Sequence, residues 1–95
     1  MEPPSSDAAY LNNPRPAYPA VSLRLREQGT VRLRVLVGAD GTVRKLELEQ
    51  SSGFERLDQA ALKAVATWKF VPGRRAGVVE EMAVDVPIPF RITNK

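Results

Sequence analysis

The chain has 95 residues, enough for one small domain, and a formal net charge of +3 from 14 basic and 11 acidic side chains. It contains no cysteine and no histidine, which excludes disulfides, zinc sites of the usual ligand types, and thiol or imidazole catalysis. No run of basic residues is longer than two, so the sequence does not predict a nucleic-acid partner. No apolar run reaches the roughly 20 residues of a membrane span, so a membrane anchor is not expected within this chain.

The first part of the chain is polar and rich in proline. Prolines stand at positions 3, 4, 14 and 16, and residues 1–16 show neither helical nor strand periodicity. We predict a flexible linker over residues 1–13 and a folded domain over residues 14–95. A frayed terminus has the same composition and is an equal alternative to the linker.

A short helix is predicted to begin at Pro19, because proline at the first helical position loses no hydrogen bond. Gly29 is expected to end it about ten residues later. One face of this helix would carry Val21, Leu25 and Ser22, and the other Arg24 and Glu27. Such a helix is too short to persist unless it packs on other elements.

The central part of the chain predicts a β-hairpin. Apolar and polar residues alternate over Thr30–Val37, and Asp40-Gly41 can adopt the positive φ angles of a tight turn. In the run that follows, Val43 has the wrong parity for the later apolar residues, which predicts a bulge near Arg44. A two-stranded hairpin is not stable alone, so flanking segments must cover its apolar face.

A second helix is predicted over Phe54–Lys69. Ser52 and Glu55 have the spacing of a capping box at its start. Residues 73–77 after it are expected to form a basic loop. Trp68 is expected to anchor the helix end in the core. The apolar stripe that would face the sheet consists of Leu57, Ala61, Ala64, Val65 and Trp68.

The last run, Met82–Ile92, has the cleanest period-2 alternation in the chain and is longer than the Thr30–Val37 run, which predicts an overhang. Pro87 and Pro89 share a parity and cannot donate to a ladder, so their side of the strand must be an outer edge. We therefore predict an α+β fold in the order helix-strand-strand-helix-strand. Two helices would cover one face of a three-stranded antiparallel sheet of order 2-1-3.

Seven short motifs fall in order at matching spacings and carry a family resemblance. They are Tyr18-Pro19, Gly29-x-Val31, Asp40-Gly41-x-Val43, Ser51-Ser52-Gly53, Leu57-Asp58-x-Ala60-Ala61, Trp68-x-Phe70-x-Pro72 and Val86-Pro87-Ile88-x-Phe90. Over residues 13–92 the chain resembles the C-terminal domain of TonB proteins, the periplasmic energy transducers of Gram-negative bacteria. The resemblance implies a helix-strand-strand-helix-strand domain.

The resemblance also implies a location and partners. In that family a Pro-rich periplasmic linker and an inner-membrane helix driven by ExbB and ExbD precede the domain, so anchoring and these two partners would involve regions outside this chain. The family's other partner is the TonB box, a short segment of outer-membrane receptors for siderophores, haem or cobalamin, which docks as an added strand beside the last strand. The sequence leaves monomer and homodimer open.

Family members often carry Gln-Pro-x-Tyr-Pro before the first helix, a segment that also contacts the receptor. This chain has Arg15 at the first position of that motif, whereas Pro16, Tyr18 and Pro19 match it. The cation at Arg15 would favour an acidic partner segment. Tyr18 alone stays open between a recognition role and a structural one.

We interpret the chain as an interaction module that acts by strand addition and not as an enzyme. Because the two prolines of the last strand offer carbonyls only, main-chain pairing should centre on residues 81–85. The predicted partner-binding residues are Arg15, Pro16, Tyr18, Glu81, Ala83, Asp85 and Arg91. No catalytic residue, metal ligand or cofactor is predicted.

Other classes fit the sequence less well. A periplasmic scaffold of the TolA type, with a related fold and other envelope partners, is the alternative. A nucleic-acid module would need a basic face with stacking aromatics, and the aromatics here fall mostly at core or helix-boundary positions. Asp58 and Ser51-Ser52 are more simply explained as residues of a helix start than as catalytic groups. Arg32 and Arg34 are expected on a solvated sheet face.

Overall fold

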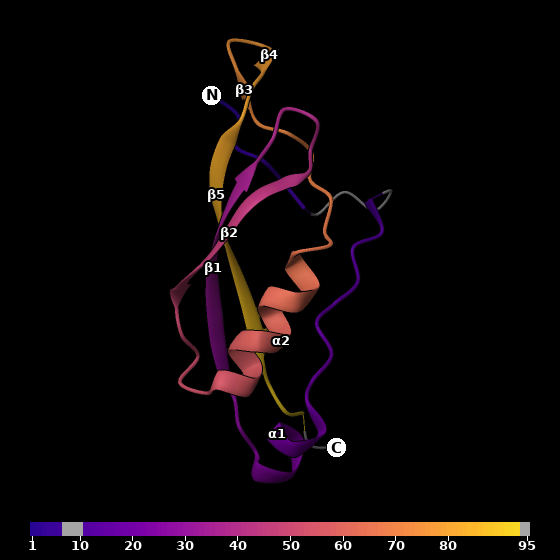
Figure 1. Ribbon diagram of the computed structural model, residues 1–95, viewed down its shortest axis with the longest axis vertical. Coiled ribbons are helices and arrows are strands. Elements are labelled where there is room, and N and C mark those ends of the chain that lie inside the picture. The colour runs from indigo at the N-terminus through magenta and orange to yellow at the C-terminus, as the bar shows by residue number, and fades with distance from the viewer. Residues whose placement is uncertain (7–10, 94–95) are drawn as a thin grey trace.

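The computed structural model describes residues 1–6 and 11–93. Its elements are α1 (Ala20–Leu25), β1 (Gly29–Val37), β2 (Val43–Gln50), α2 (Glu55–Val65), β3 (Arg74–Arg75), β4 (Val78–Val79) and β5 (Met82–Phe90). The three long strands form an antiparallel sheet in the order β2-β1-β5, and β3 pairs with β4 in a separate hairpin (Figure 1). The predicted α+β fold and its 2-1-3 sheet order are confirmed, with β5 as the third long strand. The basic loop predicted over residues 73–77 instead contains β3.

The core lies between the sheet and α2, which crosses one face of it (Figure 1). Every second residue of β1 is buried against the helix, because side chains alternate between the two faces of a strand. Arg32 and Arg34 lie exposed on the opposite face, as predicted. The buried core consists of Val31, Leu33, Val35, Val37, Leu57, Ala61, Val65, Phe70, Val86, Ile88 and Phe90.

The turn between β1 and β2 requires glycine at position 41. Gly41 has φ of 84°, and a Cβ there would lie 2.3 Å from the carbonyl oxygen of Phe70. The close approach lets the amide of Phe70 donate to the Gly41 carbonyl at 2.8 Å, which ties the turn to the segment after α2. The β1–β2 register skips Arg44, where a bulge is predicted, and also skips Glu49, where none is predicted.

β5 pairs with β1 along its whole length. The register runs without a shift from Phe90 opposite Gly29 to Met82 opposite Val37. The predicted overhang is therefore wrong, since β1 begins one residue earlier than expected and β5 ends at Phe90. Within Met82–Phe90, every residue of β5 has a partner on β1, so β5 does not extend beyond β1.

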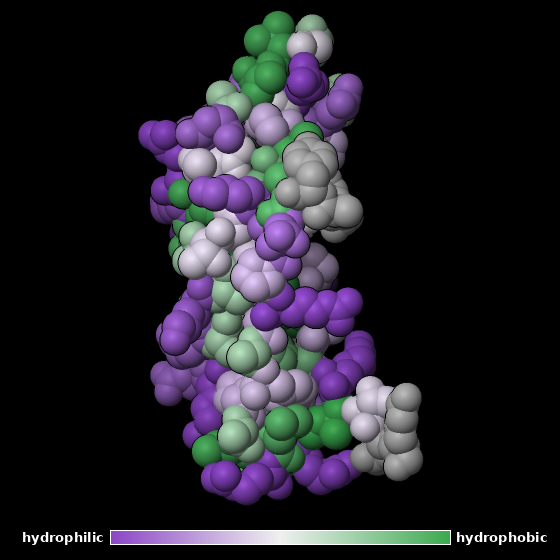
Figure 2. All heavy atoms as spheres, turned by 90° about the vertical axis from the view of Figure 1, so that its right-hand side faces the viewer, coloured by the Kyte–Doolittle hydropathy of each residue, from purple (hydrophilic) through white to green (hydrophobic). Residues whose placement is uncertain are grey.

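The first helix differs most from its prediction. α1 ends at Leu25 because Arg26 adopts the left-handed conformation, with φ of 58°, that was expected of Gly29. Val21 and Leu25 are 37% and 60% exposed, so the predicted packing of this face is wrong for both, whereas Ser22 on the same face is buried. Figure 2 shows hydrophobic surface at the lower end of the molecule, where α1 lies.

Polar contacts, and not apolar packing, hold α1 on the domain. Ser22 and Glu27 are buried, and the Ser22 hydroxyl donates to Oε1 of Glu27 at 2.7 Å. Arg56 of α2 donates to Oε2 of Glu27 at 3.1 Å. The hydroxyl of Tyr18 donates to the Glu27 carbonyl. Glu27 thus joins α1, α2 and the segment before α1.

Asp58, and not Glu55, closes the N-terminal end of α2. Oδ1 of Asp58 accepts hydrogen bonds from the Ser52 amide at 2.9 Å and the Ser52 hydroxyl at 2.8 Å, and Oδ2 accepts from the Ser51 hydroxyl. Glu55 is exposed, and Phe54 at the N-cap makes no side-chain cap. The predicted capping box is therefore wrong in both members, because Ser52 lies before the N-cap and its hydroxyl accepts from the Phe54 amide at 3.2 Å. Burial acts to raise the pKa of Asp58, but the hydrogen bonds from Ser51 and Ser52 outweigh it and lower that pKa.

Candidate functional site

The outer side of β5 is an open sheet edge. Within the ranges that the structure describes, no strand pairs with β5 on the side away from β1. Pro87 and Pro89 lie opposite Arg32 and Thr30. Because a proline has no N–H, these two pairs are the type without inter-strand hydrogen bonds, and the main-chain groups of that parity point outward.

The prolines restrict where this edge can donate. Ala83 and Asp85 share the parity of the prolines and keep their N–H groups, so they offer outward donors and acceptors within β5. Pro87 and Pro89 offer outward carbonyls only. Main-chain pairing with another strand is therefore complete only near the start of β5.

Two adjacent hollows lie beside this edge. The first has a volume of about 390 Å³ and is lined by Pro4, Ser5, Ser6, Trp68, Phe70, Val84, Asp85, Val86 and Pro87. The second has a volume of about 520 Å³ and is lined by Arg15, Pro16, Tyr18, Trp68, Pro87, Ile88, Pro89, Phe90 and Arg91. Trp68 and Pro87 belong to both hollows.

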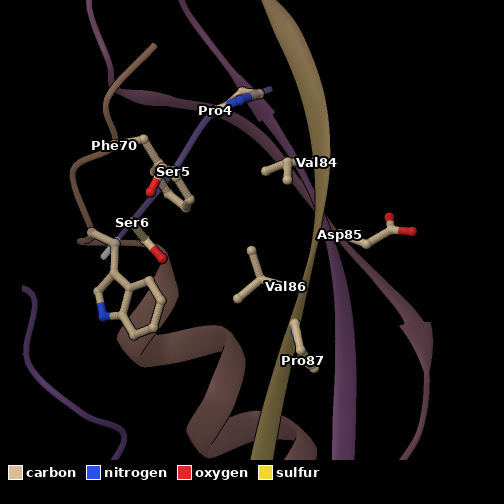
Figure 3. A pocket seen from close by; sticks show the side chains of 9 residues that line it. Pro4, Ser5, Ser6, Phe70, Val84, Asp85, Val86 and Pro87 are labelled. Atoms are coloured by element: carbon tan, nitrogen blue, oxygen red, sulfur yellow. The ribbon is translucent and has the colours of Figure 1, made fainter. Parts of the chain in front are cut away.

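Side chains of β5 alternate between the first hollow and the exposed sheet face. Figure 3 shows Val84 and Val86 pointing toward the hollow and Asp85 pointing to the opposite side. There Arg34 donates to Oδ1 of Asp85 at 3.2 Å, with both side chains exposed. A side-chain hydrogen bond with Asp85 raises the pKa of Glu49 on β2. A strand added to β5 would likewise alternate between the hollows and this charged cluster.

The second hollow combines aromatic walls with a positive rim. The rings of Tyr18 and Phe90 meet edge to face at 5.3 Å. Arg15 and Arg91 are exposed beside them, and none of the residues lining this hollow is acidic. No ion pair joins either arginine to another residue in the ranges 1–6 and 11–93. The hollow therefore offers apolar contact next to positive charge that no described acidic side chain pairs with.

The predicted partner-binding residues fall at three places. Asp85 lines the first hollow through β5. Ala83 lies half-buried in β5 opposite Leu36, and Glu81 is exposed just before the strand. Neither residue lines a hollow. The residues that line the second hollow are Arg15, Pro16, Tyr18 and Arg91. Their role in binding stays a prediction.

Sequence reasoning missed two parts of this surface. Trp68 packs against the core as predicted, but α2 ends at Val65 and not at Lys69, so Trp68 lies after the helix. It is only half-buried and also lines both hollows. Pro4, Ser5 and Ser6 line the first hollow although their segment was assigned to a linker. No periodicity marks these three residues, so nothing in the sequence pattern could have placed them there.

This surface gathers groups that can bind a partner. Among the described residues, no three side chains of metal-ligating type lie together. None of the helices in the described ranges is long and apolar enough to cross a membrane. What the surface does offer is main-chain donors and acceptors, two hollows and a positive rim.

Comparisons with known proteins extend this description. A family model described as Gram-negative bacterial TonB protein C-terminal matches residues 14–92. The chain is 49% identical over 89 residues to Protein tonB2 of Pseudomonas aeruginosa, covering 94% of this chain and 33% of that protein. It is 37% identical over 78 residues to Protein TonB of Vibrio cholerae, covering 82% of this chain and 32% of that protein. The chain thus spans about a third of the length of these relatives.

Proposed function

This chain belongs to the family of TonB C-terminal domains, and on that premise we propose that it is the receptor-binding domain of a TonB-like energy transducer. The domain docks the TonB box of outer-membrane receptors by strand addition. In the full-length protein it lies in the periplasm, tethered to the inner membrane by regions outside this chain that engage ExbB and ExbD. Proton-motive energy then drives uptake of siderophores, haem or cobalamin. The family match favours this function over a TolA-type scaffold.

The observation that carries the proposal is the open outer edge of β5. An extended peptide that adds to a sheet edge gains main-chain hydrogen bonds, each worth about 0.5–1.5 kcal/mol net, and gains specificity from pockets for alternate side chains. Ala83 and Asp85 supply the outward donors, and the hollows lie on one side of the same edge. The prolines further along limit indiscriminate pairing with other strands.

The positive rim of the second hollow supports a further element of the proposal. A TonB-box segment that pairs near Ala83 and Asp85 continues past Pro87 toward Arg15 and Arg91. Complementary charge at an exposed rim speeds association and improves selectivity more than it raises affinity. Receptors with acidic residues beside the pairing segment are therefore the preferred partners in this proposal.

A titration followed by amide NMR tests where the peptide binds. A TonB-box peptide should shift the amide signals of Ala83 and Asp85 and the indole signal of Trp68, whereas a scrambled peptide of the same composition should leave them in place. The opposite sheet edge, β2, serves as the internal control through Leu48, which is exposed. Shifts confined to β2 or to α1 would contradict docking on β5.

A further inference from the structure

The first residues of the chain are held against the segment between α2 and β3. Glu2 and Arg74 exchange two backbone hydrogen bonds, both at 2.8 Å, and Ser5 and Val71 exchange two at 3.0 and 2.7 Å. The two residues between Glu2 and Ser5 are prolines, which lack N–H groups, so the bonds fall on the residues that flank them. Residues 2–5 therefore form an extended, paired segment.

Close packing joins this segment to the start of β5. Pro4 and Gly73 are both buried. A Cβ on Gly73 would lie 2.7 Å from the sulfur of Met82, the first residue of β5, and 3.1 Å from the carbonyl oxygen of Glu2. The segment, Gly73 and the first residue of β5 thus meet without space for another side chain.

A second set of hydrogen bonds holds the chain at Asn13. The side-chain amide of Asn13 donates to the Lys69 carbonyl at 2.8 Å, and its oxygen accepts from the Lys69 amide at 2.8 Å. Asn13 also donates to the Ser6 carbonyl at 3.3 Å. The described residues on both sides of positions 7–10 are therefore tied to the same stretch of the folded domain.

This segment forms one side of the first hollow, facing β5. Figure 3 shows Ser5 and Ser6 across the hollow from Val84 and Val86. We propose that residues 4–6 are a wall of the docking site and select an aliphatic side chain on the added partner strand. This inference rests on strand addition to β5, because alternate side chains of such a strand point toward the hollow.

The lining explains the preference for an aliphatic group. Ser5 and Ser6 bring hydroxyls to the hollow, and the other six uncharged lining residues are apolar, namely Pro4, Trp68, Phe70, Val84, Val86 and Pro87. Asp85, which also lines it, turns its carboxylate to the opposite sheet face (Figure 3). A charged partner side chain would lose hydration there without gaining an opposite charge, whereas an aliphatic one gains from leaving water.

Two series of peptides, both based on one TonB-box peptide, test the wall directly. In one series Leu replaces each alternate residue in turn, and in the other Ala replaces the same residues. Calorimetry measures the affinity of each peptide. At the position that faces the hollow, the unchanged protein should prefer Leu over Ala by about ten-fold. Ser5→Pro removes the donor to Val71 and should reduce the preference to less than about three-fold. The affinity for the Ala peptide should stay within about two-fold.

Pro3→Ala is the matched control, because Pro3 is exposed on the same segment, and it should keep the full Leu preference. Pro4→Gly removes the buried ring that lines the hollow and provides a second variant if Ser5→Pro does not melt cooperatively. An unchanged Leu preference in folded Ser5→Pro and Pro4→Gly would overturn the proposal. Tighter binding of both peptides would also overturn it, because the segment would then compete with the partner. If the unchanged protein binds neither peptide on β5, strand addition itself fails.

Discussion

Trp68 donates its indole N–H to the carbonyl oxygen of Pro14 at 2.7 Å. The bond joins the residues just after α2 to the residue before Arg15, across 54 positions of the sequence. The indole also lies 6.4 Å from the ring of Phe70, in a tilted arrangement. Trp68 therefore packs on the core through one part of its ring and fixes the path of the segment that lines the second hollow through another.

Two substitutions separate these roles of Trp68. Trp68→Ala should lower the free energy of unfolding by about 2–3 kcal/mol, less than the ~3–5 of a fully buried aromatic, because the side chain is half-exposed. Trp68→Phe keeps a ring but removes the donor to Pro14, and should cost about 1 kcal/mol. Urea denaturation measures both. In a thermal melt, a melting temperature of Trp68→Ala within a degree of that of the unchanged protein would place the indole outside the core.

Asp58 should make stability depend on pH in the acid range. Burial acts to raise the pKa of Asp58, but hydrogen bonds from Ser51 and Ser52 prevail and hold it below the ordinary value of 3.8. The folded state therefore binds protons less readily than the unfolded state. The resulting stabilisation is fully present above about pH 5 and is lost as the pH falls through and below the ordinary value.

Asp58→Asn should lower the free energy of unfolding by about 1–2 kcal/mol at pH 7, because the amide replaces one charged acceptor of these bonds. The difference from the unchanged protein should shrink below about pH 4, where the carboxyl of Asp58 in the unfolded state begins to protonate while the native one stays ionised. Glu55→Gln is the control, since Glu55 is exposed at the same helix end, and it should change stability little. A larger loss for Glu55→Gln would restore the capping box as the sequence predicts it.

The sheet and α2 could be predicted because each follows from burial on one side of a regular element. Alternation in β1 and β5 and the apolar stripe of α2 have periods that the backbone geometry dictates. The parity of Pro87 and Pro89 also placed the outer edge, since a missing N–H is a property of the residue itself. The turn at Asp40-Gly41 was predictable for the same kind of reason.

Contacts between distant polar groups could not be predicted in this way. Arg26 ends α1 in the left-handed conformation, while Ser22, Glu27 and Arg56 form hydrogen bonds and an ion pair that no periodicity reveals. In the candidate site, Arg15 and Tyr18 were found through a motif. The N-terminal segment that lines the first hollow was not found in this way, because residues 2–5 gain their structure from pairing with residues 71–74.

Asp85→Pro tests the outward donor on β5. The substitution removes one N–H from the outer edge and leaves the β1 ladder unchanged, so it should weaken a TonB-box peptide by about five-fold or more. Asp85→Ala is the matched control, because it loses the contact with Arg34 but keeps the N–H. Fluorescence anisotropy measures both affinities, and cooperative melting shows that both variants fold. Equal affinities for the two variants would place docking elsewhere.

Arg15→Gln and Arg91→Gln test the positive rim of the second hollow. The probes are two TonB-box peptides that differ only in carrying Asp or Asn at the positions flanking the pairing segment. The unchanged protein should prefer the Asp peptide by about three- to ten-fold in low salt, because exposed charge pairs contribute only a few tenths to about 1 kcal/mol each. Each variant should reduce that preference, and about 0.5 M salt should remove most of it, because the Debye length is then only about 4 Å.

The control for both rim variants is Arg24→Gln, which removes an exposed cation from the last turn of α1, away from both hollows. All four proteins should bind the Asn peptide with similar affinity, since that peptide brings no charge to the rim. If Arg24→Gln lowers the Asp preference as much as Arg15→Gln does, the preference reflects the net positive charge of the chain and not the rim. A selective loss in Arg15→Gln and Arg91→Gln would instead assign the readout of acidic flanks to the second hollow.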